Sequence, residues 1–195
     1  MNDQDIFRWI LGAGCLLLFP FGFYHRWKSQ TGEKLDRRQE GWFILITLRL
    51  LGVCGMLGLL AFLFRPQWIE WAAVPLPLTL RWSGVGLAMV TGLLYFWTFR
   101  SLGKNLTDTV VTRKDHTLVT TGPYRWIRHP FYVAGMLLVL GTSLISANAF
   151  IFVTGSAALC LLVIRTRKEE QNLIARFGDN YRNYMQRTGR FFPRL

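Results

Sequence analysis

The sequence predicts an all-α membrane protein with five transmembrane helices, the last two a helical hairpin, followed by a cytoplasmic C-terminal helical extension. Hydrophobic residues make up 51% of the 195 residues and charged residues only 17%, which is apolar for a soluble domain. Several stretches are also nearly free of charge over the roughly 20 residues that a helix needs to cross a bilayer.

Three of these apolar stretches lie in the first half of the chain: Phe7–Tyr24, Gly41–Phe64 and Trp82–Phe99. A fourth run, residues 131–164, carries no charge. As a single helix it would be about 51 Å long, which exceeds a hydrocarbon core of about 30 Å. Ser146-Ala147-Asn148 in the middle of the run is typical of a turn, with Asn148 as a helix cap. We therefore expect two short membrane helices joined at this turn.

Positive charge alternates from one connecting segment to the next. Residues 25–40 carry five Lys or Arg, residues 65–81 two, residues 100–130 six and residues 165–195 eight. Under the positive-inside rule, the N-terminus is expected outside and the C-terminus in the cytoplasm of a multi-pass protein, in the cell membrane if the source is prokaryotic. Basic residues beside membrane helices also touch anionic lipid head groups, so the net charge of +12 predicts a bilayer partner and no nucleic acid.

Few polar residues interrupt the apolar stretches. Cys15, Cys54 and Cys160 fall inside them, widely separated, and we interpret them as small buried hydrophobes without a disulfide. No Cys/His spacing of a metal site is present, so no metal is expected. Arg49 lies within the second stretch, where a charge either serves a function or extends to the membrane interface. The sequence leaves these two interpretations of Arg49 open.

The segment around His129-Pro130 is the first candidate site. A residue before proline is pushed out of the helical region, and proline is favoured at the first helical position. We therefore expect the fourth membrane helix to begin at Pro130, with its free N–H groups facing a polar ligand. An interfacial histidine bonded to a loop carbonyl is an equally good interpretation of His129. Tyr124 and Tyr132 nearby are either membrane anchors or walls for a ligand ring.

The second candidate cluster follows the last apolar run. Arg165 and Glu169 are four residues apart and share a helix face, which places a cation at the membrane surface and an acid one turn beyond it. A surface ion pair explains this spacing equally well. Further on, Gly178 is expected to stop the helix, Asp179 to cap the next one, and Gly189 to close it.

Taken together, these residues resemble the isoprenylcysteine carboxyl methyltransferase family of integral membrane enzymes. The resemblance runs from about residue 102 to residue 193, whereas residues 1–100 match only as apolar helices. Its motifs are Leu102-Gly103, His116-x-Leu118-Val119, Gly122-Pro123-Tyr124, Arg128-His129-Pro130-x-Tyr132, Glu169-Glu170, Phe177-Gly178, Tyr181, Tyr184, and Arg190 followed by Pro193. One departure is Leu106, where relatives often have tryptophan after Gly-x-Asn.

The resemblance implies S-adenosyl-L-methionine as the methyl donor, bound on the cytoplasmic side. The cofactor-binding residues that it implies are His116, Thr117, Leu118, Val119, Tyr124, His129, Pro130, Phe131, Tyr132 and Glu169. Arg165 would bind the methyl acceptor and, with Glu169, form the catalytic pair. It further implies a single integral membrane domain over residues 1–195. In that domain residues 1–100 form a three-helix scaffold, and residues 101–195 form the cofactor loop, hairpin and C-terminal helices that complete the site.

The implied reaction is methyl transfer to a lipophilic acceptor, the carboxylate of a prenylcysteine-like substrate, at the cytoplasmic membrane face. A carboxylate is already ionised at neutral pH and needs no base. The alternatives are a methyltransferase acting on phospholipids or small thiols, with Glu170 or His129 as the base, and an NADPH enzyme similar to sterol reductases. The third alternative is a membrane scaffold without catalytic activity.

Overall fold

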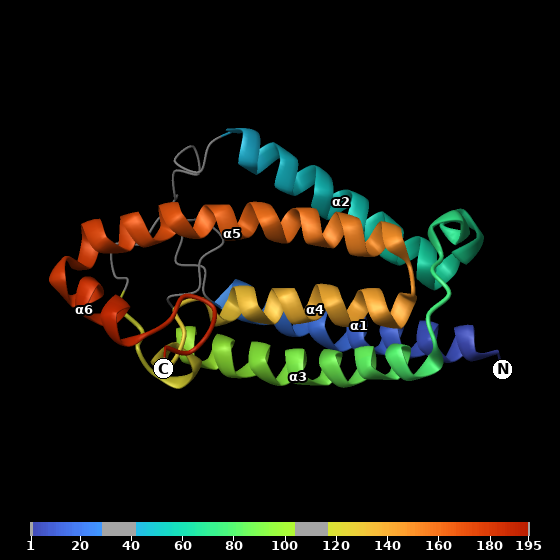
Figure 1. Cartoon of the computed structure of the whole chain (residues 1–195), viewed down its shortest axis with the longest axis horizontal. Coiled ribbons are helices and arrows are strands. Elements are labelled where there is room, and N and C mark those ends of the chain that lie inside the picture. The colour runs from blue at the N-terminus through green and yellow to red at the C-terminus, as the bar shows by residue number, and fades with distance from the viewer. Residues whose placement is uncertain (1, 29–41, 104–116, 195) are drawn as a thin grey trace.

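The computed structural model describes residues 2–28, 42–103 and 117–194, and in these ranges its regular elements are helices (Figure 1). Short 3-10 helices connect longer α-helices at several points. In chain order the elements are α1 (Asp3–Lys28), α2 (Trp42–Phe64), η2 (Pro66–Trp68), η3 (Glu70–Ala72), α3 (Leu78–Leu102), η5 (Gly122–Arg125), α4 (Pro130–Ser146), α5 (Ala149–Phe177) and α6 (Asp179–Arg187).

Four of the helices, α1, α2, α3 and α5, are long and apolar enough to cross a membrane. The fifth apolar helix, α4, has 17 residues and is about 26 Å long, slightly less than a hydrocarbon core of about 30 Å. The predicted class, an α-helical multi-pass membrane protein, is confirmed. The uncharged run is also divided into two helices, as its length required.

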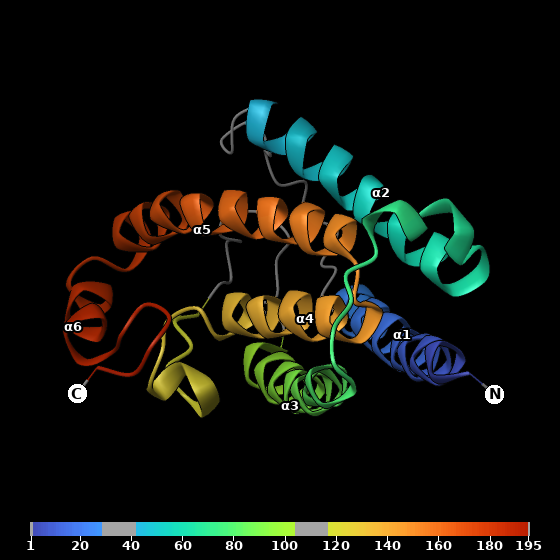
Figure 2. The ribbon, with the colours of Figure 1, turned by 45° about the vertical axis from the view of Figure 1, so that its right-hand side comes forward.

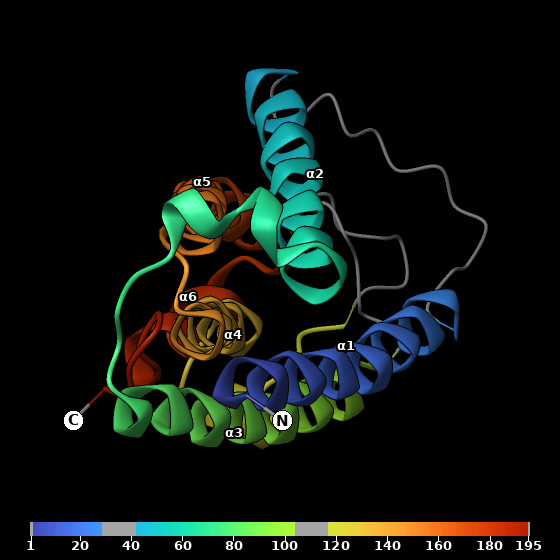
Figure 3. The same ribbon diagram turned by 90° about the vertical axis from the view of Figure 1, so that its right-hand side faces the viewer.

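Successive apolar helices run in opposite directions (Figure 1). The last residues of α1, α3 and α5 and the first residues of α2 and α4 therefore lie at one end of the bundle, which we call the site end; Figure 3 views the bundle from the opposite end. The N-terminus, η2, η3 and the α4–α5 turn lie at the other, the far end. The described parts of the basic segments predicted to share one side of the membrane, residues 25–28, 100–103, 117–130 and 165–194, adjoin the site end.

The α4–α5 turn has the predicted geometry. Asn148 caps α5, because its side-chain oxygen accepts hydrogen bonds from the backbone N–H groups of Phe150 (3.0 Å) and Ile151 (3.3 Å). Its Nδ2 donates to the Ile69 carbonyl at 2.9 Å and so joins η2 to the turn. Ala147 adopts the left-handed conformation (φ 49°), which reverses the chain direction.

Glycines allow α3 and α4 to cross closely. A Cβ added at Gly84 would lie 2.9 Å from the Gly141 carbonyl oxygen, whereas one added at Gly86 would meet nothing within 4 Å. Small residues permit this approach between membrane helices. The same reasoning applies between α2 and α5, where a Cβ at Gly58 would lie 2.7 Å from the Phe150 ring but one at Gly52 would be in open space.

Two arginines stabilise the far end. Arg81, 5% exposed, donates from Nε (3.1 Å) and Nη2 (2.7 Å) to the Ile145 carbonyl near the end of α4. Its guanidinium also lies 3.9 Å from the centre of the Phe7 ring. Arg8 donates to the Leu63 carbonyl at 2.6 Å near the end of α2. Both side chains satisfy carbonyls that have no partner within their own helix.

Several local predictions were wrong. Cys54 and Cys160 are exposed instead of buried, because α2 and α5 present wide apolar faces to their surroundings and α2 leans away from the bundle (Figure 2). Asp179 does not cap α6: Gly178 is the N-cap, and the Asp179 carboxylate instead accepts from Arg182 at 2.8 Å on the surface.

Two other predictions are not contradicted. Helix α6 ends at Arg187 with Thr188 as its C-cap, so Gly189 is the residue directly after the cap. Arg49, for which the sequence left two interpretations open, is exposed on α2.

Candidate functional site

The start of α4 is built as its sequence predicted. Pro130 is the first helical residue and His129 is the N-cap in a non-helical conformation (φ −124°, ψ 56°). The preceding η5 turn is held against α3 by Gly122, whose φ of 62° is left-handed and where a Cβ would collide with Ser101. Glycine is therefore required to bring this turn close to the end of α3.

The end of α5 closes against the start of α4. The Tyr132 hydroxyl donates to Glu169 Oε2 at 2.8 Å, although the two residues are 37 positions apart. Tyr132 is buried and Glu169 half-buried. The structure thus joins the two clusters that the sequence could describe only separately, the segment around His129 and the segment around Glu169.

Glu170, the acid next to Glu169, is the centre of a buried polar network. We call this network the Glu170 cluster, and its members are Arg128, His129, Glu170 and Arg190. Glu170 Oε1 accepts from Arg128 Nε at 2.8 Å and lies 3.2 Å from His129 Nε2. Glu170 Oε2 accepts from Arg190 Nη2. The Glu170 side chain is only 4% exposed and that of His129 only 3%.

Glu170 lies beyond residue 164, where the apolar part of α5 ends. Burial alone would raise the pKa of its carboxyl group. Hydrogen bonds from His129, Arg190 and Arg128 outweigh that effect and hold the pKa well below its usual range. The carboxylate is therefore ionised at neutral pH and acts as the counter-charge of two guanidinium groups.

The C-terminal segment, residues 188–191, is attached to the start of α4. The backbone N–H groups of Arg128 and His129 donate to the carbonyls of Gly189 (2.9 Å) and Arg190 (3.1 Å). Arg128 Nη1 additionally donates to the carbonyls of Met185 (3.2 Å) and Thr188, which satisfies the end of α6. The C-terminal segment therefore forms one side of the site.

Helix α6 supports the loop from behind. The Tyr184 hydroxyl donates to the Tyr124 carbonyl at 2.7 Å, and burial raises the pKa of Tyr184 to about 12. Burial, followed by the charge of Glu169, also raises the pKa of Tyr124. Both phenols are therefore neutral at physiological pH, and Tyr124 lies within electrostatic reach of Glu169.

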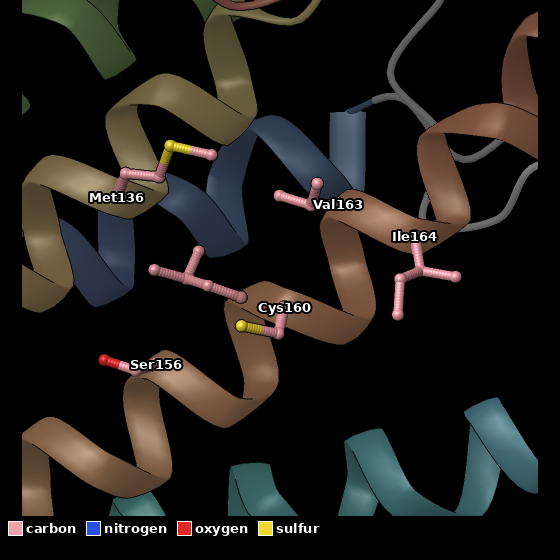
Figure 4. A pocket seen from close by; sticks show the side chains of 6 residues that line it. Met136, Ser156, Cys160, Val163 and Ile164 are labelled. Atoms are coloured by element: carbon pink, nitrogen blue, oxygen red, sulfur yellow. The ribbon is translucent and has the colours of Figure 1, made fainter.

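An apolar groove lies between α4 and α5 (Figure 4). Relative to the polar residues of the site end, it is displaced toward the far end of the bundle. Its volume is about 440 Å³, and its lining residues are Met136, Ser156, Leu159, Cys160, Val163 and Ile164. Two contacts bound it along the helices. Toward the far end α4 and α5 meet where a Cβ at Gly155 would lie 2.9 Å from Val139, and at the site end they meet through Tyr132 and Glu169.

The predicted site residues are distributed unevenly around this arrangement. Tyr124, His129, Tyr132 and Glu169 gather at the site end, and Pro130 starts α4 among them. Phe131 points to the α3 side, where its ring centre lies 5.6 Å from that of Phe99. Arg165 is half-buried on α5, one turn before Glu169, while Leu118 and Val119 are half-buried and Thr117 exposed. His116 and the departure at Leu106 lie outside the described residues.

Sequence reasoning missed the residues that hold the site together. The roles of Arg128 and Arg190 were not identified, and Glu170 was considered only as a base. Arg128 is 42 residues from Glu170 and Arg190 is 20 residues from it, so no local periodicity links them. A signal was nevertheless present, since all three residues belong to the motifs that carried the family resemblance.

Fold and site together define a multi-pass α-helical membrane protein with a polar site at one end of a helix pair and an apolar groove between the same two helices. Residues 84–175 match the family described as the isoprenylcysteine carboxyl methyltransferase (ICMT) family. The match covers slightly less than half of the chain, which is similar to that family over this region.

Its relatives include two groups of proteins. The cobalt-zinc-cadmium resistance protein CzcN of Cupriavidus metallidurans is 35% identical over 121 residues, which cover 62% of this chain and 51% of that protein. The protein-S-isoprenylcysteine O-methyltransferase of Dictyostelium discoideum is 34% identical over 127 residues, covering 62% and 53%. The chain thus spans about half the length of these relatives.

A solved structure is also similar. The eukaryotic intramembrane Ras methyltransferase ICMT superposes with a TM-score of 0.53 at 27% sequence identity. The similarity covers 76% of this chain and 51% of that one. It therefore extends beyond the matched residues 84–175 into the rest of the helical bundle.

Proposed function

We propose that this protein transfers a methyl group from S-adenosyl-L-methionine to the carboxylate of a prenylcysteine-like acceptor at the cytoplasmic membrane face. The observation that carries the proposal is the juxtaposition of a polar site and an apolar groove on α4 and α5. A polar donor and a lipophilic acceptor can meet where these two regions adjoin. The similarity of residues 84–175 to the methyltransferase family supports the same reaction.

The polar residues fit the proposed donor. S-adenosyl-L-methionine has amino and hydroxyl groups, which donate hydrogen bonds, and a flat base. Glu169 supplies a carboxylate that accepts such bonds, and Tyr124 supplies a ring. When bound, S-adenosyl-L-methionine supplies an electrophilic methyl carbon, whose bond to sulfur breaks, leaving its electron pair on sulfur, as the acceptor oxygen bonds to it.

The groove and its site end fit the proposed acceptor. An apolar chain would lie between Met136 and Val163, with its carboxylate near Arg165, which can bind such a group through two parallel hydrogen bonds. An ionised carboxylate needs alignment and exclusion of water, not a base. Glu170 is poorly suited to act as a base for an amine or thiol, because its two oxygens already face three nitrogen groups.

The first test is donor binding. We expect isothermal titration calorimetry of the protein in lipid nanodiscs to detect S-adenosyl-L-methionine, and Glu169→Ala to weaken that binding. Absence of binding by the intact protein would contradict the proposal, and binding of NADPH in its place would favour a reductase.

The second test identifies the acceptor. A methyl-transfer assay with labelled donor would compare prenylcysteines, phosphatidylethanolamine and small thiols, and we expect transfer to the prenylcysteine carboxylate. Cys160→Trp, which fills the groove, should raise the KM of that acceptor without changing donor affinity. Cys54→Trp is the matched control, because Cys54 is also exposed but lies on α2. Equal effects of the two substitutions would contradict the role of the groove.

A further inference from the structure

The contact between His129 and Glu170 carries information about the proton on the histidine ring. His129 Nε2 lies 3.2 Å from Glu170 Oε1, and both side chains are almost completely buried. An ionised carboxylate can only accept hydrogen bonds. A lone pair on Nε2 would face the oxygen lone pairs at this distance without a proton between them, which is unfavourable in a buried site. Nε2 must therefore carry the hydrogen.

We propose that Glu170 is a positioning residue that holds His129 as the neutral Nε2–H tautomer and leaves Nδ1 as the hydrogen-bond acceptor of the site. Two guanidinium groups, those of Arg128 and Arg190, already face the single carboxylate. A second proton on the ring would add a third positive charge to the same buried cluster, so the neutral ring is favoured.

The surroundings of the ring hold it in this orientation. Its centre lies 5.3 Å from the Tyr132 ring and 5.8 Å from the Phe191 ring. The His129 backbone N–H is bonded to the Arg190 carbonyl at 3.1 Å. Glu170 thus fixes the ring through its side chain, and the C-terminal segment fixes its backbone. A histidine held in this way presents one defined nitrogen to a ligand.

The consequence for ligand recognition rests on the proposed function. A nitrogen with a free lone pair accepts a hydrogen bond from a hydroxyl or ammonium group, both of which S-adenosyl-L-methionine has. It would also be the atom that takes a proton from an amine or thiol acceptor. The tautomer itself does not depend on the reaction that the protein catalyses.

Nitrogen NMR tests the tautomer directly. The chain has three histidines, so a His25→Gln/His116→Gln variant labelled with ¹⁵N-histidine and placed in lipid bilayers reports on His129 alone. At pH 7.5 we expect one protonated nitrogen, assigned as Nε2, and one unprotonated nitrogen, assigned as Nδ1. A protonated Nδ1 would overturn the proposal, and this measurement needs no change at Glu170.

Substitution then tests the role of Glu170. In the same background, Glu170→Gln should give a mixture of tautomers or a protonated Nδ1. Glu169→Gln, the matched control one residue away, should leave the His129 signals unchanged. Circular dichroism tests whether each variant is folded. If Glu170→Gln unfolds, Glu170→Asp, which keeps the charge, takes its place. In Glu170→Asp we expect a weaker preference for the Nε2–H tautomer of His129. Unchanged signals in a folded Glu170→Gln or Glu170→Asp variant would overturn the proposal.

A final arm adds S-adenosyl-L-methionine and follows the Nδ1 signal, which we expect to shift. No shift under conditions where calorimetry detects binding would refute the recognition role of Nδ1 alone. Because His116 is itself a predicted cofactor-binding residue, donor binding is also measured on the unsubstituted protein: no binding there would refute the proposed function, while the tautomer result would stand.

Discussion

Removing the Glu170 carboxylate should strongly destabilise the site end of the protein. Glu170→Ala would leave the guanidinium groups of Arg128 and Arg190 facing each other without a counter-charge. Breaking a buried ion pair by removing one partner costs about 3–5 kcal/mol. The side chain of Arg128 is 10% exposed and that of Arg190 36% exposed. Arg190 can therefore turn toward water, and most of the cost should fall on Arg128.

The free energy of unfolding in mixed detergent micelles measures the loss, and hydrogen exchange locates it. We expect faster exchange in α6 and the C-terminal segment, because Arg128 also bonds to the carbonyls of Met185 and Thr188. Asp179→Ala is the matched control, since it removes a carboxylate from an exposed pair with Arg182, a change of less than about 1 kcal/mol. If both substitutions cost the same, the Glu170 cluster does not stabilise the site.

Three further substitutions test other parts of the structure. Tyr132→Phe removes the hydroxyl that donates to Glu169 and should lower the free energy of unfolding by about 1.5–3 kcal/mol, measured by detergent titration; no change would contradict the contact. Arg81→Gln should lower the thermal midpoint but leave the Kd of S-adenosyl-L-methionine unchanged, because its contacts lie at the far end; a weakened donor affinity would contradict that separation. Gly84→Ala should cost about 1–3 kcal/mol through overpacking, whereas Gly86→Ala should be nearly neutral, so similar melting curves for the two would exclude a close crossing at Gly84.

Features that depend on neighbouring residues were predictable from the sequence. Asn148 caps α5 because its side chain reaches backbone groups two and three residues ahead. Pro130 starts α4 because the proline ring is compatible with the first helical position and disfavours a helical residue before it. Errors arose where a local signal had two outcomes, as at Asp179, where the adjacent Gly178 took the N-cap position.

Features that depend on how helices are placed were not predictable in the same way. Arg81 reads as a charge at the end of a loop, yet it is buried against a carbonyl 64 residues away. The apolar groove exists because Val139 and Gly155 set the helix spacing toward one end and Tyr132 and Glu169 set it at the other.

The sequence alone determined the helical membrane class, the hairpin turn and the family resemblance, because hydrophobic length, turn residues and motif spacing are properties of the chain itself. The tertiary structure decided how the polar residues act on one another. It placed Glu170 among Arg128, His129 and Arg190, and left Glu169 to Tyr132. Two adjacent acids on one helix point in different directions, so only the packing of the helices determines which partner each acid meets.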